Sequence, residues 1–382
     1  MQDVPVAIRL NPFKGSCGPE GSPVPWNPLG RILPSRPSFT ADPLFHAGCY
    51  YVQDSSAMFP GYLLRRVLED GFAREGLRVL DLCASPGGKT TDAAASLRAL
   101  LGDRFLLVSN EVTRSRVPVL LDNTARWGDP CVTVCSADPS VFGKLAPGCF
   151  DIIIADVPCS GEGMFRKDPR AREEWSPAVV DLCAARQKRI LADVWPALAE
   201  GGVLIYSTCT YEDSENDSNL EWAAAKLGCE ILPPPGAEFA SFGVRPPRCG
   251  SLLKAGEVPG EGQWAGTLIK TSLSARRPSR FDVAALRPLR TGISRGMMKG
   301  GDYIPHADEA LAIGFDRSRF PEAELGLEEA LRYLHRDSLY LPDAPRGIIT
   351  VTYKGHPLGF VKNLGTRCNN LLPPGRRILM DI

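Results

Sequence analysis

The chain has 382 residues, of which 44% are hydrophobic and 23% charged, and its formal net charge at pH 7 is zero. These values are typical of a soluble globular protein with two or three domains, and the balanced charge gives no indication of a nucleic-acid partner. The 12 cysteines include no C-x-x-C pair and there are only four histidines, which argues against a zinc ribbon or another metal site. No apolar run approaches the ~18 residues of a membrane span, and no signal peptide is recognisable. We therefore expect a cytoplasmic protein with reduced thiols.

Residues 1–60 are rich in proline and glycine and show no sustained periodicity. We expect them to form a loop-rich arm, with short strands at best, laid over another domain. Helical patterning begins near Ser56 and continues through Leu68.

Residues 61–273 alternate between short apolar runs and helical patterns. Strands are expected at 78–83, 105–109, 131–135, 151–155, 202–207 and 264–270, and helices at 91–101, 113–127, 177–198 and from about 213 to 227. This alternation predicts an α/β domain with a mostly parallel, doubly wound, Rossmann-like sheet.

Residues 274–382 are expected to be a linker followed by a smaller, separable α+β region, with a helix at 322–334 and a strand at 347–353. The start of this region is basic and contains Arg276, Arg277, Arg280, Arg287, Arg290, Arg295 and Lys299. Such a stretch is consistent with contacts to phosphates and, equally, with a solvated linker.

The segment from Asp81 to Lys89 follows one predicted strand and opens the next helix. Gly87 and Gly88 lack Cβ atoms, so a ligand can approach the backbone N–H groups closely, and the helix N-terminus favours an anionic group. The spacing matches neither G-x-G-x-x-G nor the P-loop, which disfavours a dinucleotide or a nucleoside triphosphate.

Two further acids follow the next two predicted strands. Glu111 is placed to bind the two hydroxyls of a ribose, and Asp138 to accept a hydrogen bond from an adenine amino group. Each alone is more typical of a solvated loop. Together, at consecutive strand ends, they outline a nucleoside pocket that fits S-adenosylmethionine better than NAD.

Two cysteines are expected at the same sheet edge. Cys209 ends the strand that begins near Gly202, and Cys159 follows the strand that ends at Asp156. An isolated cysteine is usually a core residue. Two cysteines and an aspartate beside a methyl donor instead suggest cytosine-5 methylation, in which a thiolate adds to C6 and makes C5 nucleophilic. Asp156 would then hold the base, and either cysteine is positioned to attack.

Three stretches resemble the RNA cytosine-5 methyltransferases of the Sun/Nop type. They are Cys83-Ala-Ser-Pro-Gly-Gly-Lys89, Asp156-Val-Pro-Cys-Ser-Gly-Glu-Gly-Met-Phe-Arg-Lys-Asp168 and Ser207-Thr-Cys-Thr-Tyr-Glu-Asp-Ser-Glu-Asn216. The extension Gly163 to Asp168 resembles the bacterial RsmF branch, which methylates cytidine in small-subunit ribosomal RNA. Looser matches are Arg186-Gln187, Gly260 to Trp264 and, in the C-terminal region, a PUA-like RNA-binding module.

This resemblance implies that Cys209 is the nucleophile and Cys159 the cysteine that assists release. It implies that the methyl donor, S-adenosylmethionine, is bound by Cys83, Ala84, Ser85, Pro86, Gly87, Gly88, Lys89, Glu111, Arg116, Asp138 and Asp156. The implied partner is ribosomal RNA, either free or in the assembled small subunit, and the protein is expected to be monomeric.

The motif Arg9 to Lys14 is internal in the family, so the N-terminal arm is expected to be a truncated form of the family's N-terminal region. Gln263 stands where a histidine is common in the RsmF branch. Two alternatives are the same chemistry on transfer RNA and a non-catalytic RNA-binding assembly factor. The intact set of two cysteines and Asp156 speaks against the second, because binding alone needs no thiols.

Overall fold

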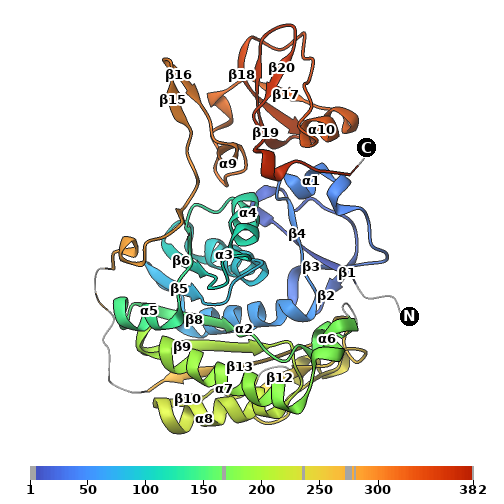
Figure 1. The fold of residues 1–382 in the computed structure, drawn as a ribbon. Helices are drawn as coiled ribbons and strands as arrows, with labels where there is room; N and C mark the ends of the chain where they lie inside the picture. The colour runs from blue at the N-terminus through green and yellow to red at the C-terminus, as the bar shows by residue number, and fades with distance from the viewer. Residues whose placement is uncertain (1–5, 166–168, 235–236, 272–277, 279–280, 381–382) are drawn as a thin grey trace.

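The computed structural model describes residues 6–165, 169–234, 237–271, 278 and 281–380 (Figure 1). Its centre is a ten-stranded mixed sheet in the order β11-β12-β13-β9-β8-β5-β6-β7-β14, with β10 also pairing with β13. Five neighbouring strands are parallel: β5 (Leu77–Asp81), β6 (Phe105–Asn110), β7 (Val132–Cys135), β8 (Phe150–Asp156) and β9 (Leu198–Thr208). The chain runs from β5 outward to β7 and then returns to β8 on the other side of β5, so the direction of winding reverses between β5 and β8.

The remaining strands of this sheet are antiparallel additions at its two sides. They are β10 (Cys229–Ile231), β11 (Val244–Arg245), β12 (Gly250–Leu253), β13 (Gln263–Lys270) and β14 (Arg290–Thr291). The strand β13 lies directly beside β9, with Trp264 opposite Thr208. This pairing places the residues that precede β13 next to the carboxyl end of β9.

Helices cover both faces of the sheet, as expected for a doubly wound fold. One group is α2 (Phe59–Val67), α3 (Gly88–Leu101) and α4 (Val117–Trp127), and the other is α5 (Pro139–Leu145), α7 (Pro177–Val194) and α8 (Asp217–Leu227). Successive strand residues alternate between the two cores: Ile152 and Ile154 belong to the first, and Ile153 belongs to the second. Strands buried on both faces read as continuous apolar runs. The predicted α/β, Rossmann-like class is confirmed.

Several element boundaries differ from the sequence-based expectation. The helix α4 begins at Val117 because Pro118, which has no N–H to donate, fits the first turn. The helix α7 ends at Val194, and β9 already begins at Leu198. The helix expected at 322–334 is a strand, β17 (Glu322–Glu324), followed by α10 (Leu327–Leu334), whose start is capped at Gly326.

The N-terminal residues form a defined sheet, which corrects the expectation of a loop-rich arm. Four antiparallel strands pair in the order β2-β3-β1-β4: β1 (Val6–Leu10), β2 (Ser22–Val24), β3 (Asn27–Leu33) and β4 (Tyr50–Val52). The short helix α1 (Pro43–His46) precedes β4. Two of the strands are only three residues long, and β2 and β3 contain prolines, so no alternating pattern was long enough to predict them.

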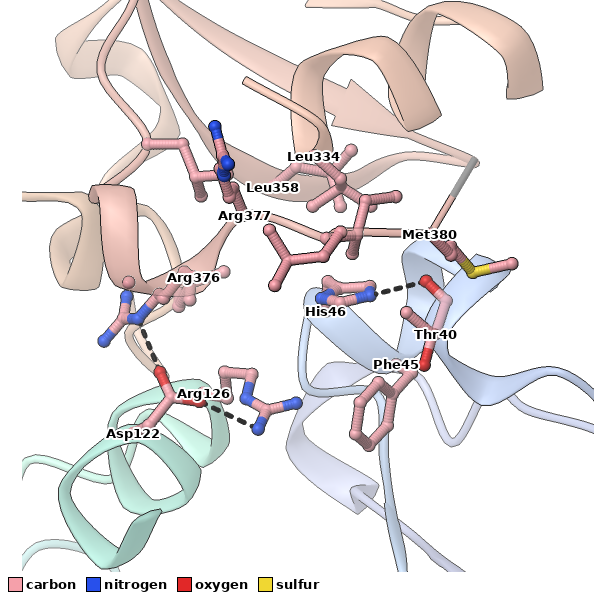
Figure 2. A pocket seen from close by; sticks show the side chains of 15 residues that line it. Thr40, Phe45, His46, Asp122, Arg126, Leu334, Leu358, Arg376, Arg377 and Met380 are labelled. Carbon is pink, nitrogen blue, oxygen red and sulfur yellow. Dashed lines mark hydrogen bonds and ion pairs between the residues drawn. The ribbon is translucent and has the colours of Figure 1, made fainter. Parts of the chain in front are cut away.

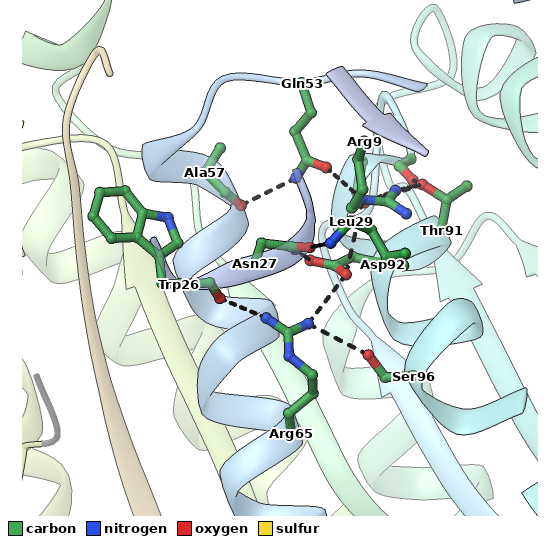
Figure 3. Close-up of polar contacts among 12 residues, drawn as sticks. Arg9, Trp26, Asn27, Leu29, Gln53, Ala57, Arg65, Thr91, Asp92 and Ser96 are labelled. Atoms are coloured by element: carbon green, nitrogen blue, oxygen red, sulfur yellow. Dashed lines mark hydrogen bonds and ion pairs between the residues drawn. The ribbon is translucent and has the colours of Figure 1, made fainter. Parts of the chain in front are cut away.

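A buried ionic cluster fastens this N-terminal sheet to α3 (Figure 3). Arg9 on β1 has no exposed surface; its guanidinium lies 3.8 Å from the Asp92 carboxylate and also bonds Gln53 and Thr91. Asp92 accepts a further hydrogen bond from Asn27 at 3.0 Å and pairs with Arg65 of α2 at 3.4 Å. Three segments distant in sequence thus meet at the Asp92 carboxylate. Their contacts fix the position of α3 close to its N-terminus.

The C-terminal region contains a hairpin and a small sheet. The hairpin is β15 (Met297–Lys299) and β16 (Asp302–Ile304), and the sheet is β17, β18 (Gly347–Tyr353), β19 (His356–Asn363) and β20 (Cys368–Asn370), flanked by α10. The remaining short helices are α6 (Pro169–Glu174) and α9 (Ala307–Ala310). The predicted linker at 274–280, apart from Pro278, and its arginines lie outside the described residues.

This region is not separable, contrary to the sequence-based expectation. The strand β14 joins the central sheet through β7. A single core cluster contains Ile8 and Leu10 of β1 together with Tyr333 of α10 and Val351 of β18. Removing the C-terminal region would expose the apolar face of the N-terminal sheet. Within the described residues, no helix has both the length and the apolar character that a membrane crossing requires.

Candidate active site

A cavity of about 310 Å³ opens at the carboxyl ends of β5, β8 and β9. This is where ligands of doubly wound sheets bind, at the reversal of strand order. The predicted site residues that line it are Cys83, Ala84, Ser85, Pro86, Gly88, Lys89, Asp156 and Cys209. Further lining residues were not predicted. Among them, Gln53 and Asp54 follow β4, Glu261 lies just before β13, and Gln263 is the first residue of β13.

The two predicted catalytic cysteines lie against each other. The Sγ atoms of Cys159 and Cys209 are 3.2 Å apart. Their loops are tied together by main-chain and side-chain contacts: Gly163 N donates to Cys209 O at 2.7 Å, and Glu162 Oε2 accepts from Tyr211 N at 2.6 Å. The two thiols therefore sit in one fixed arrangement rather than on independent loops.

The contact between the two cysteines shifts their pKa values in opposite directions. The hydrogen bond from the Cys159 thiol lowers the pKa of Cys209, against the effect of burial, and the nearby Lys89 cation acts in the same direction as that hydrogen bond. The same contact and burial raise the pKa of Cys159 well above its ordinary value. A hydrogen bond to the charged form favours that form. The arrangement thus favours a thiolate at Cys209 and a neutral thiol at Cys159.

Asp156 at the end of β8 is held by three donors. Lys89 Nζ lies 2.8 Å from Oδ2, while Ser207 Oγ and Gln263 Nε2 donate to Oδ1 at 2.7 and 3.1 Å. Burial works against the charge of Lys89, but the pKa of this amine is raised by the Asp156 carboxylate. The structure thus gives Gln263 a physical role, which sequence reasoning did not supply because it depends on β13 lying beside β9.

The loop from Cys83 to Lys89, here called the donor loop, has little side-chain bulk at its turn. Gly87 adopts a φ of +109°, and a Cβ on Gly88 would lie 3.2 Å from Gln53. Asn123 Nδ2 of α4 donates to Pro86 O at 2.7 Å. At the end of β5, burial raises the pKa of Asp81 to about 7, and its carboxylate accepts a hydrogen bond from Thr90 at 2.6 Å.

Three residues predicted to bind the methyl donor, Glu111, Arg116 and Asp138, lie outside the lining of this cavity. Glu111 is 2% exposed; its Oε1 accepts from Thr113 N at 2.7 Å, and its Oε2 has no hydrogen-bond donor among the described residues. Arg116 lies 3.5 Å from Glu111 and donates to the main chain of the donor loop at Ser85. Asp138 is exposed and caps α5 by accepting from Ser140 N at 3.0 Å.

No group of three or more His, Cys, Asp or Glu side chains in the described ranges is arranged to hold a metal ion.

Cys83 lines the cavity, but burial raises the pKa of its thiol far above the usual range, so it stays protonated. Cys159 and Gly87 are not among the lining residues; Cys159 contacts the lining residue Cys209, and Gly87 lies between Pro86 and Gly88 in the chain. Eight of the predicted residues thus line one cavity, whereas the presence of Gln53, Asp54 and Glu261 there depends on chain segments distant in sequence.

The chain is similar over nearly its whole length to ribosomal RNA small subunit methyltransferase F of Cronobacter sakazakii, with 38% identity covering 98% of this chain and 88% of the relative. The chain belongs to this methyltransferase F family. The Serratia proteamaculans member is 32% identical, covering 88% of this chain and 79% of the relative. This membership confirms the resemblance to the RsmF branch, a family of S-adenosylmethionine-dependent methyltransferases.

Family models match three parts of this chain. They are the N-terminal domain of 16S rRNA methyltransferase RsmF at residues 1–55, the 16S rRNA methyltransferase RsmB/F model at 72–228, and the methyltransferase RsmF PUA domain at 320–378. A solved methyltransferase homolog protein from Pyrococcus horikoshii has the same fold, with a TM-score of 0.54 and 24% identity, covering 70% of this chain and 87% of that one.

Proposed function

We propose that the protein methylates C5 of a cytidine in small-subunit ribosomal RNA, using S-adenosylmethionine and a covalent bond between Cys209 and C6 of the base. The observation that carries this proposal is the pair of thiols 3.2 Å apart beside the Lys89–Asp156 ion pair. A methyltransferase that acts on an oxygen or an amine needs no thiol nucleophile. Cytosine C5 does need one, because it is not nucleophilic until C6 is attacked.

The residues around the donor loop fit the methyl donor. The buried Oε2 of Glu111 lies 3.5 Å from Arg116 Nη1 and accepts no hydrogen bond from the described residues, so it is suited to a ribose hydroxyl. The donor loop, with Glu111, Arg116 and Asp138, would hold S-adenosylmethionine, whose sulfonium supplies an electrophilic methyl group. The absence of Cβ atoms at Gly87 and Gly88 lets the turn pack closely against Leu120 and Gln53, at the start of α3.

In the proposed reaction, the Cys209 thiolate forms a bond to C6, and the electrons of the C5–C6 double bond move to C5, which takes the methyl group. Asp156, which accepts a hydrogen bond from Lys89, would accept another from the exocyclic amine of the base. The C5 proton then passes to a base, the C5–C6 double bond re-forms and the bond from C6 to sulfur breaks. Cys159, which already donates to that sulfur, supplies a proton to it as it leaves.

The likeness of residues 320–378 to the RsmF PUA domain supports RNA binding by the C-terminal region. We assign residues 1–60 as an N-terminal region built on the β1–β4 sheet, 61–273 as the methyltransferase domain and 274–382 as the RNA-binding region of a monomeric cytoplasmic enzyme. Small-subunit ribosomal RNA is preferred over transfer RNA as substrate because the relatives that match nearly the whole chain carry that substrate in their names.

The test compares Cys209→Ala, Cys159→Ala and, as a matched control at a surface thiol, Cys17→Ala. Each is incubated with radiolabelled RNA and S-adenosylmethionine and run on a denaturing gel. Cys209→Ala is expected to lose methyl transfer and to form no adduct, Cys159→Ala to accumulate an adduct, and Cys17→Ala to behave as the wild type. An adduct with Cys209→Ala alone would reverse the two roles. Bisulfite mapping of ribosomal and transfer RNA, with and without the gene, identifies the substrate.

A further inference from the structure

A buried carboxylate lies directly behind the release cysteine. Glu215, in the 3-10 turn from Asp213 to Glu215, has no exposed surface. Its Oε2 accepts hydrogen bonds from Ser160 N at 3.1 Å and from Gln187 Nε2 at 2.6 Å. Both partners are donors, which an ionised carboxylate requires. Burial raises the pKa of Glu215, whereas these two hydrogen bonds favour its ionised form. Ser160 follows Cys159 in the chain, so the Glu215 carboxylate lies one residue from the thiol.

Gln187 of α7 binds the same loop, and Gln187 and Glu215 together are called the clamp here. The Nε2 atom of Gln187 also donates to Pro158 O at 3.0 Å, so the main chain is held on both sides of Cys159. Tyr206 of β9 donates to Gln187 Oε1 at 3.1 Å and to Glu215 O at 2.6 Å. The clamp is therefore positioned by the strand β9 and the helix α7, not by a surface loop.

The two thiols differ in the charged groups that act on them. Cys159 is affected by Cys209 and by the carboxylate of Glu215, with Tyr206 nearby, and Glu215 itself is affected by Glu162. Cys209 is affected by the carboxylate of Asp156 and also by a cation, Lys89. A negative charge disfavours a nearby thiolate, and a positive charge favours one.

We propose that Glu215 is a positioning residue for Cys159: its carboxylate fixes the loop from Pro158 to Ser160, and its charge favours the protonated thiol that points at Cys209. The inference rests on the proposed function in that it assigns the two cysteines different tasks. Without Glu215, Cys159 ionises more readily and no longer holds the proton that the departing sulfur needs. The loss affects release of the product, not the attack on C6.

The first experiment needs no RNA. In a Cys209→Ser background, alkylation of Cys159 by iodoacetamide is followed against pH by mass spectrometry of its peptide. Glu215→Gln is expected to shift the ionisation of Cys159 to lower pH and to raise its alkylation rate at pH 7 by about 3- to 10-fold, which corresponds to roughly half to one pKa unit. Asp213→Asn, which removes a carboxylate from the same turn without contacting the clamp, is the matched control and is expected to leave the profile unchanged.

An identical profile for Glu215→Gln and its parent, or an equal shift with Asp213→Asn, would overturn the proposal. Circular dichroism checks that each variant is folded. If Glu215→Gln does not fold, Glu215→Asp replaces it, because it keeps the charge but moves it away by one methylene. It is expected to shift the profile in the same direction by a smaller amount. The absence of any shift would contradict the role.

The second experiment uses the otherwise wild-type enzyme with RNA and S-adenosylmethionine. Glu215→Gln is expected to accumulate a denaturant-resistant adduct, as Cys159→Ala does, while Asp213→Asn does not. If Cys159→Ala forms an adduct and Glu215→Gln does not, the proposed role of Glu215 is contradicted. If neither Cys159→Ala nor the wild type forms an adduct, the covalent mechanism fails, and the thiol titration still decides whether Glu215 controls Cys159.

Discussion

Arg376, near the end of the chain, forms an ion pair with Asp122 of α4 at 2.7 Å (Figure 2). Asp122 also pairs with Arg126 of the same helix at 2.8 Å, and Arg376 reaches Asp308 at 2.6 Å. Asp122, Arg126 and Arg376 line a cavity of about 410 Å³ between α1, α4 and the C-terminal region. The helix α4 also carries Asn123, which bonds the donor loop. The C-terminal region is thus attached to the helix that supports the methyl-donor site.

Arg376→Ala is expected to lower the free energy of unfolding by about 2–3 kcal/mol, because it leaves Asp308, which is 3% exposed, with an uncompensated charge. The measurement is urea unfolding followed by circular dichroism. The neighbouring Arg377 is exposed, and Arg377→Ala is expected to change stability by no more than about 0.5 kcal/mol. Equal effects of the two substitutions would show that the ion pairs do not hold this junction.

Asp92→Ala removes the carboxylate on which the N-terminal sheet, α2 and α3 converge. Burial lowers the pKa of Arg9, but its guanidinium keeps its charge at neutral pH and would be left without its counter-ion. Breaking a buried pair in this way typically costs about 3–5 kcal/mol. Thermal unfolding should show a large loss for Asp92→Ala and a loss below about 1 kcal/mol for Asp103→Ala, whose ion pair with Arg98 is at the surface.

Glu111→Ala is expected to weaken binding of S-adenosylmethionine by about 10- to 100-fold. A hydrogen bond from a ribose hydroxyl to an ionised carboxylate is worth roughly 1.5–3 kcal/mol, and Ala offers no acceptor. Calorimetric titration of the donor measures the change, and RNA binding in a filter assay should be unaffected. An unchanged dissociation constant for the donor would exclude Glu111 from the site.

The pH dependence of the Cys209 thiol should differ between the wild type and Cys159→Ala. In the wild type the Cys159 hydrogen bond lowers the pKa of Cys209, so the thiolate persists to lower pH than in an ordinary cysteine and is lost only on further acidification. Removing that donor raises the pKa and shifts the rise of alkylation to higher pH. The rate of Cys209 alkylation by iodoacetamide at pH 7 is then expected to fall by about 3- to 10-fold. A rate that does not change would show that the contact between the sulfurs does not set the pKa.

Sequence reasoning predicted the parts of the site whose signals are local. The donor loop is a turn between a buried strand and a helix, and the cysteines follow apolar runs that had to be strands. Parallel strands share an edge, so Asp156, Cys159 and Cys209 were expected together. The prediction failed where no local pattern existed: the strands β2 and β4 are too short to alternate, and the position of Gln263 is meaningful only once β13 pairs with β9.

The doubly wound sheet, the order of its strands along the chain and the residues at its carboxyl edge could all be predicted from local patterns, because buried strands and capped helices are encoded by periods of a few residues. Three relationships became visible only in the folded chain: the N-terminal strands and the C-terminal region share one core, Gln263 holds Asp156, and Glu215 bonds the residue after Cys159. These relationships join residues tens to hundreds of positions apart, and they arise from the packing of apolar faces and the pairing of buried charges, which no short pattern specifies.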